Sequence, residues 1–223
     1  MKKIRVVITG ATGMVGEGVQ HVCLQNDLVE QVLVVGRKAC GIKHDKLSEI
    51  LIPDFFTLEN IKEKLSGYDA CFFCLGVSSV GMFEEQFTKT SYALTMSFAE
   101  AFAQSNPQAH FFYVSGAGTD STEHGKIMWA RVKGRTENAL QKLFPNNFYA
   151  MRPGYLHPIA GMRNTHRYYS FISWLYPLLR VITPSLVNTL NELALSMIHL
   201  TLHGSEKKHI EVKDIRLTAA QKY

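Results

Sequence analysis

The stretch TGATGMVG (Thr9–Gly16) decides the fold of this 223-residue chain. It follows a β-branched run, Ile4–Ile8, and opens a segment, Met14–Gln25, in which apolar residues recur at helical spacing. The stretch contains three glycines spaced GxxGxxG, namely Gly10, Gly13 and Gly16. The first permits a tight turn, the second lets the backbone approach a pyrophosphate, and the third lets helix and strand pack closely. The order strand, glycine loop, helix therefore predicts a dinucleotide-binding loop.

Further apolar runs alternate with helical segments up to residue 153. Strands are predicted at 31–36, 47–52, 70–76, 110–116 and 147–153, and helices at 57–65 (capped by Thr57), 87–104 and 128–143. Strands that are apolar throughout are typical of a parallel sheet covered on both faces. The sequence therefore predicts an α/β fold, a doubly wound parallel sheet of the Rossmann type.

The alternation is expected to stop at Gly154, after which a helix is predicted over 183–202. We expect one NAD(P)-binding domain over residues 1–223, in which residues from about 155 to 223 add a small, mainly helical cap on the substrate or interface side. The aromatic segment Tyr168–Ile182 fits either a substrate lid or a protein interface.

Composition narrows the class of protein. Apolar residues make up 46% of the chain and charged residues 19%, as in ordinary packed proteins. The net charge of +5 comes from scattered cations, so no nucleic-acid partner is expected. The segment Tyr168–Ile182 contains Pro177 and Arg180 and is shorter than the about 20 residues that a membrane span needs. The expected location is cytoplasmic, and four cysteines suit a reducing compartment.

No metal site is expected. Cys71 and Cys74 match CxxC, but residues three apart in a strand point to opposite faces. His199 and His203 lack the glutamate of an HExxH motif, and His203 suits the end of a helix.

The end of the second strand indicates which dinucleotide binds. An acidic residue about 20 positions after the glycine loop would bind the ribose hydroxyls of NAD, but Gly36, Arg37 and Lys38 stand there. Arg37 suits bidentate binding of a 2′-phosphate, and Lys38 adds a point charge. The sequence favours NADP (NADPH) over NAD, with solvated surface cations as the alternative.

Several motifs together resemble a known family. The glycine loop, FFCLG (72–76), FYVSGAG (112–118), VKGRTE (132–137) and MRPG (151–154) resemble the atypical short-chain dehydrogenase/reductase superfamily. Within it the chain looks most like the Tat-interacting protein 30 group of NADPH-binding proteins, which bacterial NAD-dependent epimerase-like proteins also resemble. The resemblance covers about residues 3–160 and fades in the tail.

This resemblance implies roles for individual residues. It places Asp54 at the adenine edge, Gly76 and Val77 along the adenosine, Lys133 on the nicotinamide ribose, and Ser115 after the fifth strand. Capping of a turn by Asp54, a backbone hydrogen bond by Ser115 and a surface role for Lys133 are the alternatives. The predicted cofactor set is Gly10, Thr12, Gly13, Met14, Val15, Gly16, Arg37, Lys38, Asp54, Gly76, Val77, Ser115, Lys133, Pro153, Gly154 and Tyr155.

The same resemblance predicts a catalytic site that lacks one part. The family motif YxxxK places a proton-transferring tyrosine one helical turn before the lysine. Here the sequence is WARVK, so Ser115 and Lys133 remain as predicted catalytic residues while Trp129 stands at the tyrosine position. An indole only donates hydrogen bonds and does not exchange its proton near neutral pH, so the substitution should forfeit a rate factor of about 10² to 10⁴.

Other polar residues are alternatives to these assignments. Tyr155, His157 and His124 are candidate replacement proton donors. Ser115 lies 14 residues before Trp129, slightly more than is usual in the family, so Thr119 and Ser121 are alternative hydroxyl groups. Ser91 stands where related proteins have Asn or Asp.

Two functions are therefore predicted as alternatives. The first is an NADPH-dependent oxidoreductase or epimerase-like enzyme with a degenerate motif, acting on a small carbonyl or hydroxyl compound. The second is a non-catalytic NADP-binding protein whose tail meets a partner protein.

Overall fold

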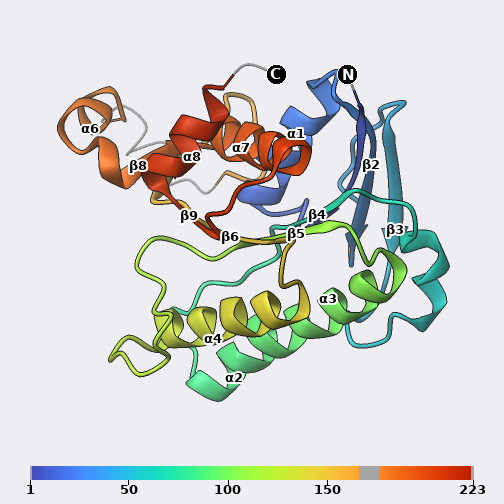
Figure 1. Cartoon of the computed structure of the whole chain (residues 1–223), viewed down its shortest axis with the longest axis horizontal. Helices are drawn as coiled ribbons and strands as arrows, with labels where there is room; N and C mark the ends of the chain where they lie inside the picture. Colours follow the sequence, from blue (N-terminus) through green and yellow to red (C-terminus); the bar gives the residue numbers. More distant parts are fainter. Residues whose placement is uncertain (1, 166–175, 222–223) are drawn as a thin grey trace.

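A seven-stranded parallel sheet forms the centre of the molecule (Figure 1). The structure is a computed structural model that describes residues 2–165 and 176–221. The strand order is β3-β2-β1-β4-β5-β6-β9, and every pair of neighbours in it is parallel. The strands are β1 (Ile4–Thr9), β2 (Val29–Gly36), β3 (Leu47–Leu51), β4 (Ala70–Phe73), β5 (His110–Val114), β6 (Phe148–Arg152) and β9 (His209–Glu211). This arrangement confirms the predicted doubly wound sheet.

Helices cover both faces of the sheet, as Figure 1 shows. One face carries α1 (Met14–Gln25), α7 (Leu190–His203) and α8 (Val212–Ala219). The other carries α2 (Glu84–Thr88), a π-helical turn η3 (Lys89–Ala93), α3 (Leu94–Ser105) and α4 (Met128–Leu143). The remaining elements are η1 (Glu59–Ile61), η2 (Glu63–Leu65), β7 (Tyr155–His157), α6 (Tyr176–Ile182), η4 (Pro184–Leu186) and β8 (Val187–Thr189).

The strand order reverses between β1 and β4. From β1 the chain moves outward to β2 and β3, and it then returns to the other side of β1 to form β4. At this point Thr9 is in register with both Val35 of β2 and Phe73 of β4. A ligand of an open parallel sheet binds at such a reversal, beyond the carboxyl ends of the strands.

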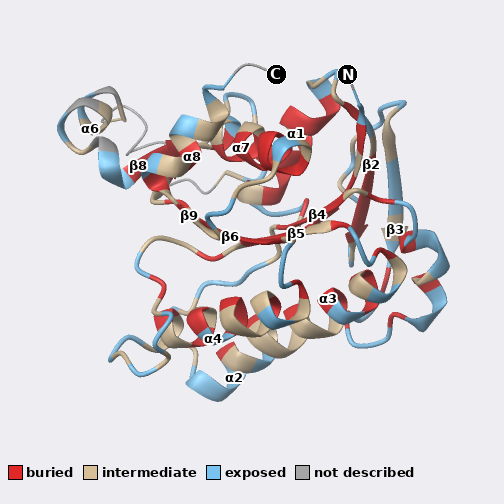
Figure 2. Cartoon of the chain, viewed as in Figure 1, coloured by how far each residue is buried: buried red, intermediate tan, exposed pale blue. Residues whose placement is uncertain are grey.

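Two apolar clusters hold the layers together. Val6 and Ile8 of β1 belong to the cluster beneath α1 and α7, whereas Val7 faces a second cluster that is rich in phenylalanine. The central strands are buried on both sides (Figure 2), which explains why their sequences are apolar throughout.

Two predicted helices differ from the structure. Residues 57–65 form the short 3₁₀ turns η1 and η2, because the Thr57 hydroxyl bonds back to the Asp54 carbonyl and does not cap a helix. The helix predicted at 87–104 begins earlier, at Glu84, and reaches Ser105 through the π-helical turn η3.

The expected end of the alternation at Gly154 is wrong. β9 pairs with β6 as a further parallel strand, and α8 follows it. The helix predicted from residue 183 begins at Leu190, because Thr189 and Glu192 form a capping box there. Of the aromatic segment Tyr168–Ile182, only α6 is described, and residues 168–175 lie outside the described residues. Among the helices that are described, none has the length and hydropathy needed to cross a membrane.

Candidate functional site

The glycine loop lies at the reversal point and touches the chain after β4. Gly10 has a φ of +74°, and an added Cβ there would lie 2.7 Å from the backbone nitrogen of Leu75. An added Cβ at Gly16 would overlap the carbonyl group of Gly10. At Gly13 the nearest atom would be the same carbonyl oxygen, at 3.5 Å. Packing within the protein therefore requires glycine at positions 10 and 16, but it leaves room for a side chain at position 13.

The loop presents the amino end of α1 to the crevice. Gly13 is the N-cap and has no side chain to bond the first helical N–H groups. The Glu17 N–H is bonded to the Gly13 carbonyl at 2.9 Å, so the N–H groups of Met14, Val15 and Gly16 have no acceptor within the helix. The Met14 side chain is buried in the core. Free N–H groups and the positive end of the helix dipole suit an anion such as a pyrophosphate.

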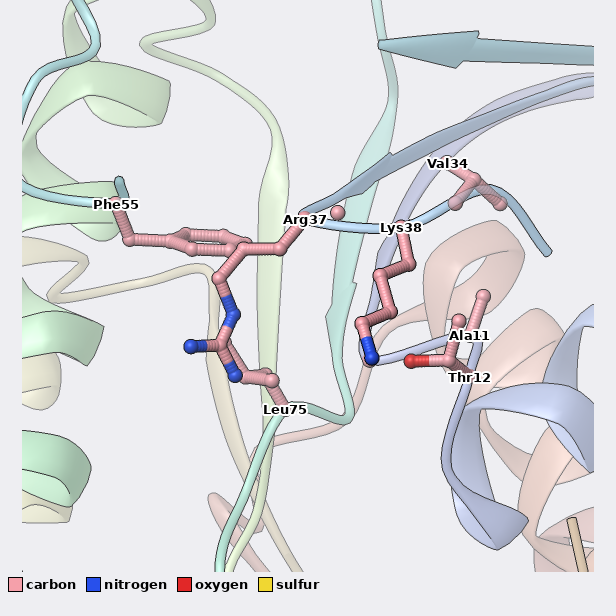
Figure 3. A pocket seen from close by; sticks show the side chains of 9 residues that line it. Ala11, Thr12, Val34, Arg37, Lys38, Phe55 and Leu75 are labelled. Carbon is pink, nitrogen blue, oxygen red and sulfur yellow. The ribbon is translucent and has the colours of Figure 1, made fainter. Parts of the chain in front are cut away.

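A pocket of about 380 Å³ lies beside this loop (Figure 3). It is lined by Gly10, Ala11, Thr12, Val34, Gly36, Arg37, Lys38, Phe55 and Leu75. Figure 3 shows that both cationic side chains extend from the end of β2 into the pocket, with Lys38 toward Thr12 and Arg37 on the side of Phe55 and Leu75. Among the residues that the structure describes, no carboxylate lines this pocket. The predicted cofactor set includes Gly10, Thr12 and the two cations, but it lacks Ala11, Val34, Phe55 and Leu75.

Three other predicted adenosine residues lie outside this lining. The Asp54 side chain is exposed, and its Oδ1 accepts a hydrogen bond from the Phe56 N–H at 3.0 Å, which is the turn-capping alternative. Gly76 and Val77 are exposed in the segment after β4. In both places the lining residue is the direct neighbour of a predicted one, namely Phe55 and Leu75.

Ser115 and Lys133 meet at the carboxyl end of β5. The Lys133 ammonium donates a hydrogen bond to the Ser115 carbonyl oxygen. The Ser115 hydroxyl donates to the Met151 carbonyl at 3.2 Å, so it makes the backbone hydrogen bond that was the alternative to a catalytic role. Lys133 is only partly exposed, and burial lowers its pKa to about 8, while the charge of Glu137 acts in the opposite direction. Lys133 can therefore exchange a proton close to neutral pH.

Trp129 lies one turn before Lys133 on α4. Its ring packs near Gly118 in the loop after β5, where an added Cβ would lie 3.8 Å from Cη2 of the indole. Thr119 and Ser121, in the same loop, bond to the Gly116 carbonyl (2.8 Å) and to Arg152 (2.6 Å) respectively. Both alternative hydroxyl groups thus have partners within the protein.

The remaining candidate residues for proton transfer, and Ser91, lie in different parts of the structure. His124 is exposed, and Ser91 is buried in the π-helical turn, where its carbonyl accepts from Thr95. Tyr155 and His157 are the first and last residues of β7, the strand that directly follows Gly154. The His157 ring stacks on Tyr176 of α6 with 3.9 Å between centroids, and burial lowers the pKa of His157.

The turn at Pro153 and Gly154 directly follows β6 and contacts both the loop after β5 and the tail. The Pro153 carbonyl accepts a hydrogen bond from the Ala117 N–H at 2.8 Å. An added Cβ at Gly154 would overlap the Leu186 carbonyl, so glycine lets η4 cross here. These contacts bring the predicted residues Ser115, Lys133, Pro153 and Gly154 to one end of β5 and β6.

Comparisons with known proteins agree with this geometry. The model of the NAD dependent epimerase/dehydratase family matches residues 6–151. A curated relative, protein HTATIP2 of Rattus norvegicus, is 25% identical over 158 residues, which are 70% of this chain and 64% of the rat protein. The match thus spans less than two thirds of that relative's length.

Solved structures share the fold at low sequence identity. The ADP-L-glycero-D-manno-heptose-6-epimerase of Helicobacter pylori has a TM-score of 0.67 and 15% identity, covering 96% of this chain and 80% of its own. The enzyme WbmF of Bordetella bronchiseptica, in complex with NAD+ and UDP, has a TM-score of 0.67 and 14% identity, covering 95% of this chain and 73% of its own. The family match, together with the rat relative, confirms the resemblance inferred from the sequence motifs.

Proposed function

Since this chain belongs to the NAD dependent epimerase/dehydratase family, we propose that it binds NADP(H) and acts as an oxidoreductase or epimerase-like enzyme on a small carbonyl or hydroxyl compound. The observation that carries the proposal is the pocket beside the glycine loop, which receives Arg37 and Lys38 and whose lining, within the described ranges 2–165 and 176–221, contains no carboxylate.

The pocket suits the 2′-phosphate of NADP better than the free ribose hydroxyls of NAD. An acidic side chain would accept hydrogen bonds from ribose hydroxyls and would repel a phosphate. A guanidinium binds phosphate through two parallel hydrogen bonds, and an ammonium adds charge without a fixed geometry. Phe55 and Leu75 supply apolar surface on the side of Arg37, which suits a planar base.

Titration with NADPH and NADH tests the cofactor preference. Wild-type protein should bind NADPH more tightly, and Arg37→Ala should weaken NADPH binding by about tenfold or more while changing NADH binding little. Lys43→Ala is the matched control, since Lys43 is an exposed cation that follows in the same loop and does not line the pocket. Equal affinity for the two dinucleotides, unaltered by Arg37→Ala, would remove the argument for NADP.

The bound cofactor would supply a hydride. In the proposed reaction the chain orients that cofactor through the amino end of α1 and through the Lys133 ammonium, which has donors left after its bond to Ser115. The substrate oxygen needs a proton from another group than Trp129, because the indole does not exchange its proton near neutral pH. Tyr155 and His157 of β7 are the candidates nearest in sequence to the turn at Gly154.

A non-catalytic NADP-binding protein is the second candidate function. Two observations favour it: tryptophan stands at the tyrosine position, and the Ser115 hydroxyl is bonded to the Met151 carbonyl. A screen of NADPH consumption against small carbonyl compounds separates the candidates. Wild-type turnover that is lost in Lys133→Ala supports the enzyme, whereas turnover that arises only in Trp129→Tyr supports the non-catalytic protein.

A further inference from the structure

A buried acid lies one helical turn beyond Lys133. Glu137 is 0% exposed, and the i, i+4 spacing puts it on the same face of α4 as Lys133. Arg152 of β6 contacts both of its oxygens: Nε donates to Oε1 at 3.1 Å, and Nη2 donates to Oε2. A bidentate pair of this kind fixes the orientation of the carboxylate as well as its charge.

Arg152 extends this pair to two other parts of the site. Its Nη2 also donates to the Ser121 hydroxyl at 2.6 Å, in the loop that begins at Ser115. Its Nη1 donates to Oε1 of Glu211 on β9 at 3.1 Å. The loop that supplies the hydrogen-bond acceptor of Lys133 is thus bonded to the buried ion pair, whose acid lies one turn from Lys133 on the same face of α4.

We propose that Glu137, held by Arg152, is a positioning residue whose negative charge keeps Lys133 protonated for the dinucleotide. The proposal rests on the cofactor role of Lys133 proposed above. Without the carboxylate, the cation of Arg152 would remain and the negative charge one helical turn from Lys133 would be lost, which disfavours the ammonium form of Lys133.

The surroundings of Lys133 shift its pKa in both directions. Burial lowers its pKa to about 8 and Glu137 opposes this shift. Beyond its own helix, the cluster includes Arg152 from β6, Glu211 from β9, and His209 from β9, whose Nε2 lies 3.6 Å from Glu137. Tyr113 of β5 faces the same carboxylate, and burial raises its pKa, so it stays neutral.

Labelling of Lys133 in Glu137→Gln tests the proposal without any cofactor. Glutamine keeps the size of the side chain and one acceptor oxygen, and it removes the charge. Competitive acetylation with acetic anhydride between pH 6 and pH 10, read by peptide mass spectrometry, gives the pH at which the Lys133 amine becomes reactive. The expected midpoint is near pH 8 in the wild type and lower in Glu137→Gln. An unchanged midpoint in a folded Glu137→Gln protein would overturn the proposal.

Asp69→Asn is the matched control for loss of a paired carboxylate. Asp69 accepts from the Arg5 N–H at 2.8 Å and pairs with Lys2 at 3.0 Å, and it precedes β4 at the opposite end of the sheet. Its removal should leave the Lys133 midpoint unchanged. If Glu137→Gln does not fold, Glu211→Gln replaces it, since Glu211 is the partly exposed outer acid of the same cluster. A smaller shift in the same direction supports the proposal, and no shift contradicts it.

NADPH affinity measured against pH separates this proposal from the cofactor role itself. Wild-type affinity should fall about tenfold between pH 7 and pH 9 as Lys133 loses its proton, and in Glu137→Gln the fall should begin at lower pH. A wild type that binds no NADPH at any pH would sink the proposed function, whereas the labelling midpoints would still decide whether Glu137 controls the charge of Lys133.

Discussion

An added Cβ at Gly16 would overlap the Gly10 carbonyl, whereas one at Gly13 would lie 3.5 Å from that oxygen. We therefore expect Gly16→Ala to destabilise the protein by about 1 to 3 kcal/mol through overpacking. Gly13→Ala should lower stability by less than about 1 kcal/mol and should weaken NADPH binding about tenfold, because its methyl group occupies the approach to the pyrophosphate. Thermal unfolding and fluorescence titration check both variants. Full NADPH affinity in Gly13→Ala would show that the pyrophosphate does not lie close to position 13.

Lys133 is a charged residue whose burial opposes folding. Its pKa is about 8 in the folded protein against an ordinary 10.5, so the unfolded chain binds more protons between these values. The penalty is complete below pH 8 and disappears above about pH 10.5. Methionine removes the charge. The free energy of unfolding of Lys133→Met should therefore exceed that of the wild type, and this difference should be larger at pH 7 than at pH 10. The relative gain should shrink by about 2 kcal/mol on going to pH 10, after allowance for partial exposure.

Urea unfolding of both proteins at pH 7 and pH 10 measures this change. The hydrogen bond from Lys133 to the Ser115 carbonyl is lost in the variant at both pH values, so it largely cancels from the comparison. A stability difference that is independent of pH would mean that Lys133 titrates as an ordinary surface lysine. The variant should also lose NADPH affinity, so that stability and binding move in opposite directions.

The pocket could be predicted only in part from local sequence. Arg37 and Lys38 follow a strand at a fixed distance from the glycine loop, so spacing alone identifies them. Phe55 and Leu75 follow β3 and β4, and they line the pocket because those strands flank β2 and β1 in the sheet. Strand order is a property of the tertiary fold, so local spacing does not identify Phe55 and Leu75, and the family resemblance points instead to their neighbours Asp54 and Gly76.

Helices with regular periodicity were the most predictable elements. α1 and α4 have the bounds expected from sequence, since apolar residues recur along one face of each. β9 was missed because it has three residues with one buried apolar side chain, Ile210, and its pairing with β6 joins distant parts of the chain. The start of α7 is encoded locally by the capping box of Thr189 and Glu192, whereas Thr183 and Pro184, which also form a helix-start signal, stand at the start of the short 3₁₀ turn η4.

The loop after β5 rests directly on α4 at Gly134. An added Cβ there would overlap the Asp120 carbonyl and lie 3.2 Å from the Ser121 nitrogen. Alanine usually stabilises a helix by about 1 kcal/mol relative to glycine, but Gly134→Ala should destabilise this protein by about 2 kcal/mol or more because backbone must move. It should also weaken NADPH binding, since the same loop carries Ser115.

Gly18→Ala in α1 is the control for Gly134→Ala. Its added Cβ would meet the Leu190 side chain, with Cδ1 at 2.6 Å, and a side chain yields more readily than backbone. Chemical denaturation of both variants should therefore give a smaller loss for Gly18→Ala. Equal losses of stability in the two variants would mean that the loop can move away from position 134 at little cost in free energy.

The tail contributes to the same core as the glycine loop. α7 packs against α1, and Leu193 and Met197 of α7 share an apolar cluster with Val19 of α1 and Ile8 of β1. On the other face of the sheet, Phe98 of α3 belongs to the second cluster. Because the sheet contributes to both clusters, we expect the tail to unfold together with the rest of the sheet and its helices as one domain.

Core substitutions on the two faces test this cooperativity. Leu193→Ala should lower the free energy of unfolding by about 3 kcal/mol and Phe98→Ala by about 4 kcal/mol, since both side chains are 0% exposed. Each should shift one transition that near-UV and far-UV circular dichroism report with the same midpoint. Leu217→Ala is the control in the tail, because its side chain is 55% exposed and its loss should change stability by less than about 0.5 kcal/mol. An early, separate transition in Leu193→Ala would instead make the tail a cap that unfolds independently, and the affinity for NADPH would then survive that first transition.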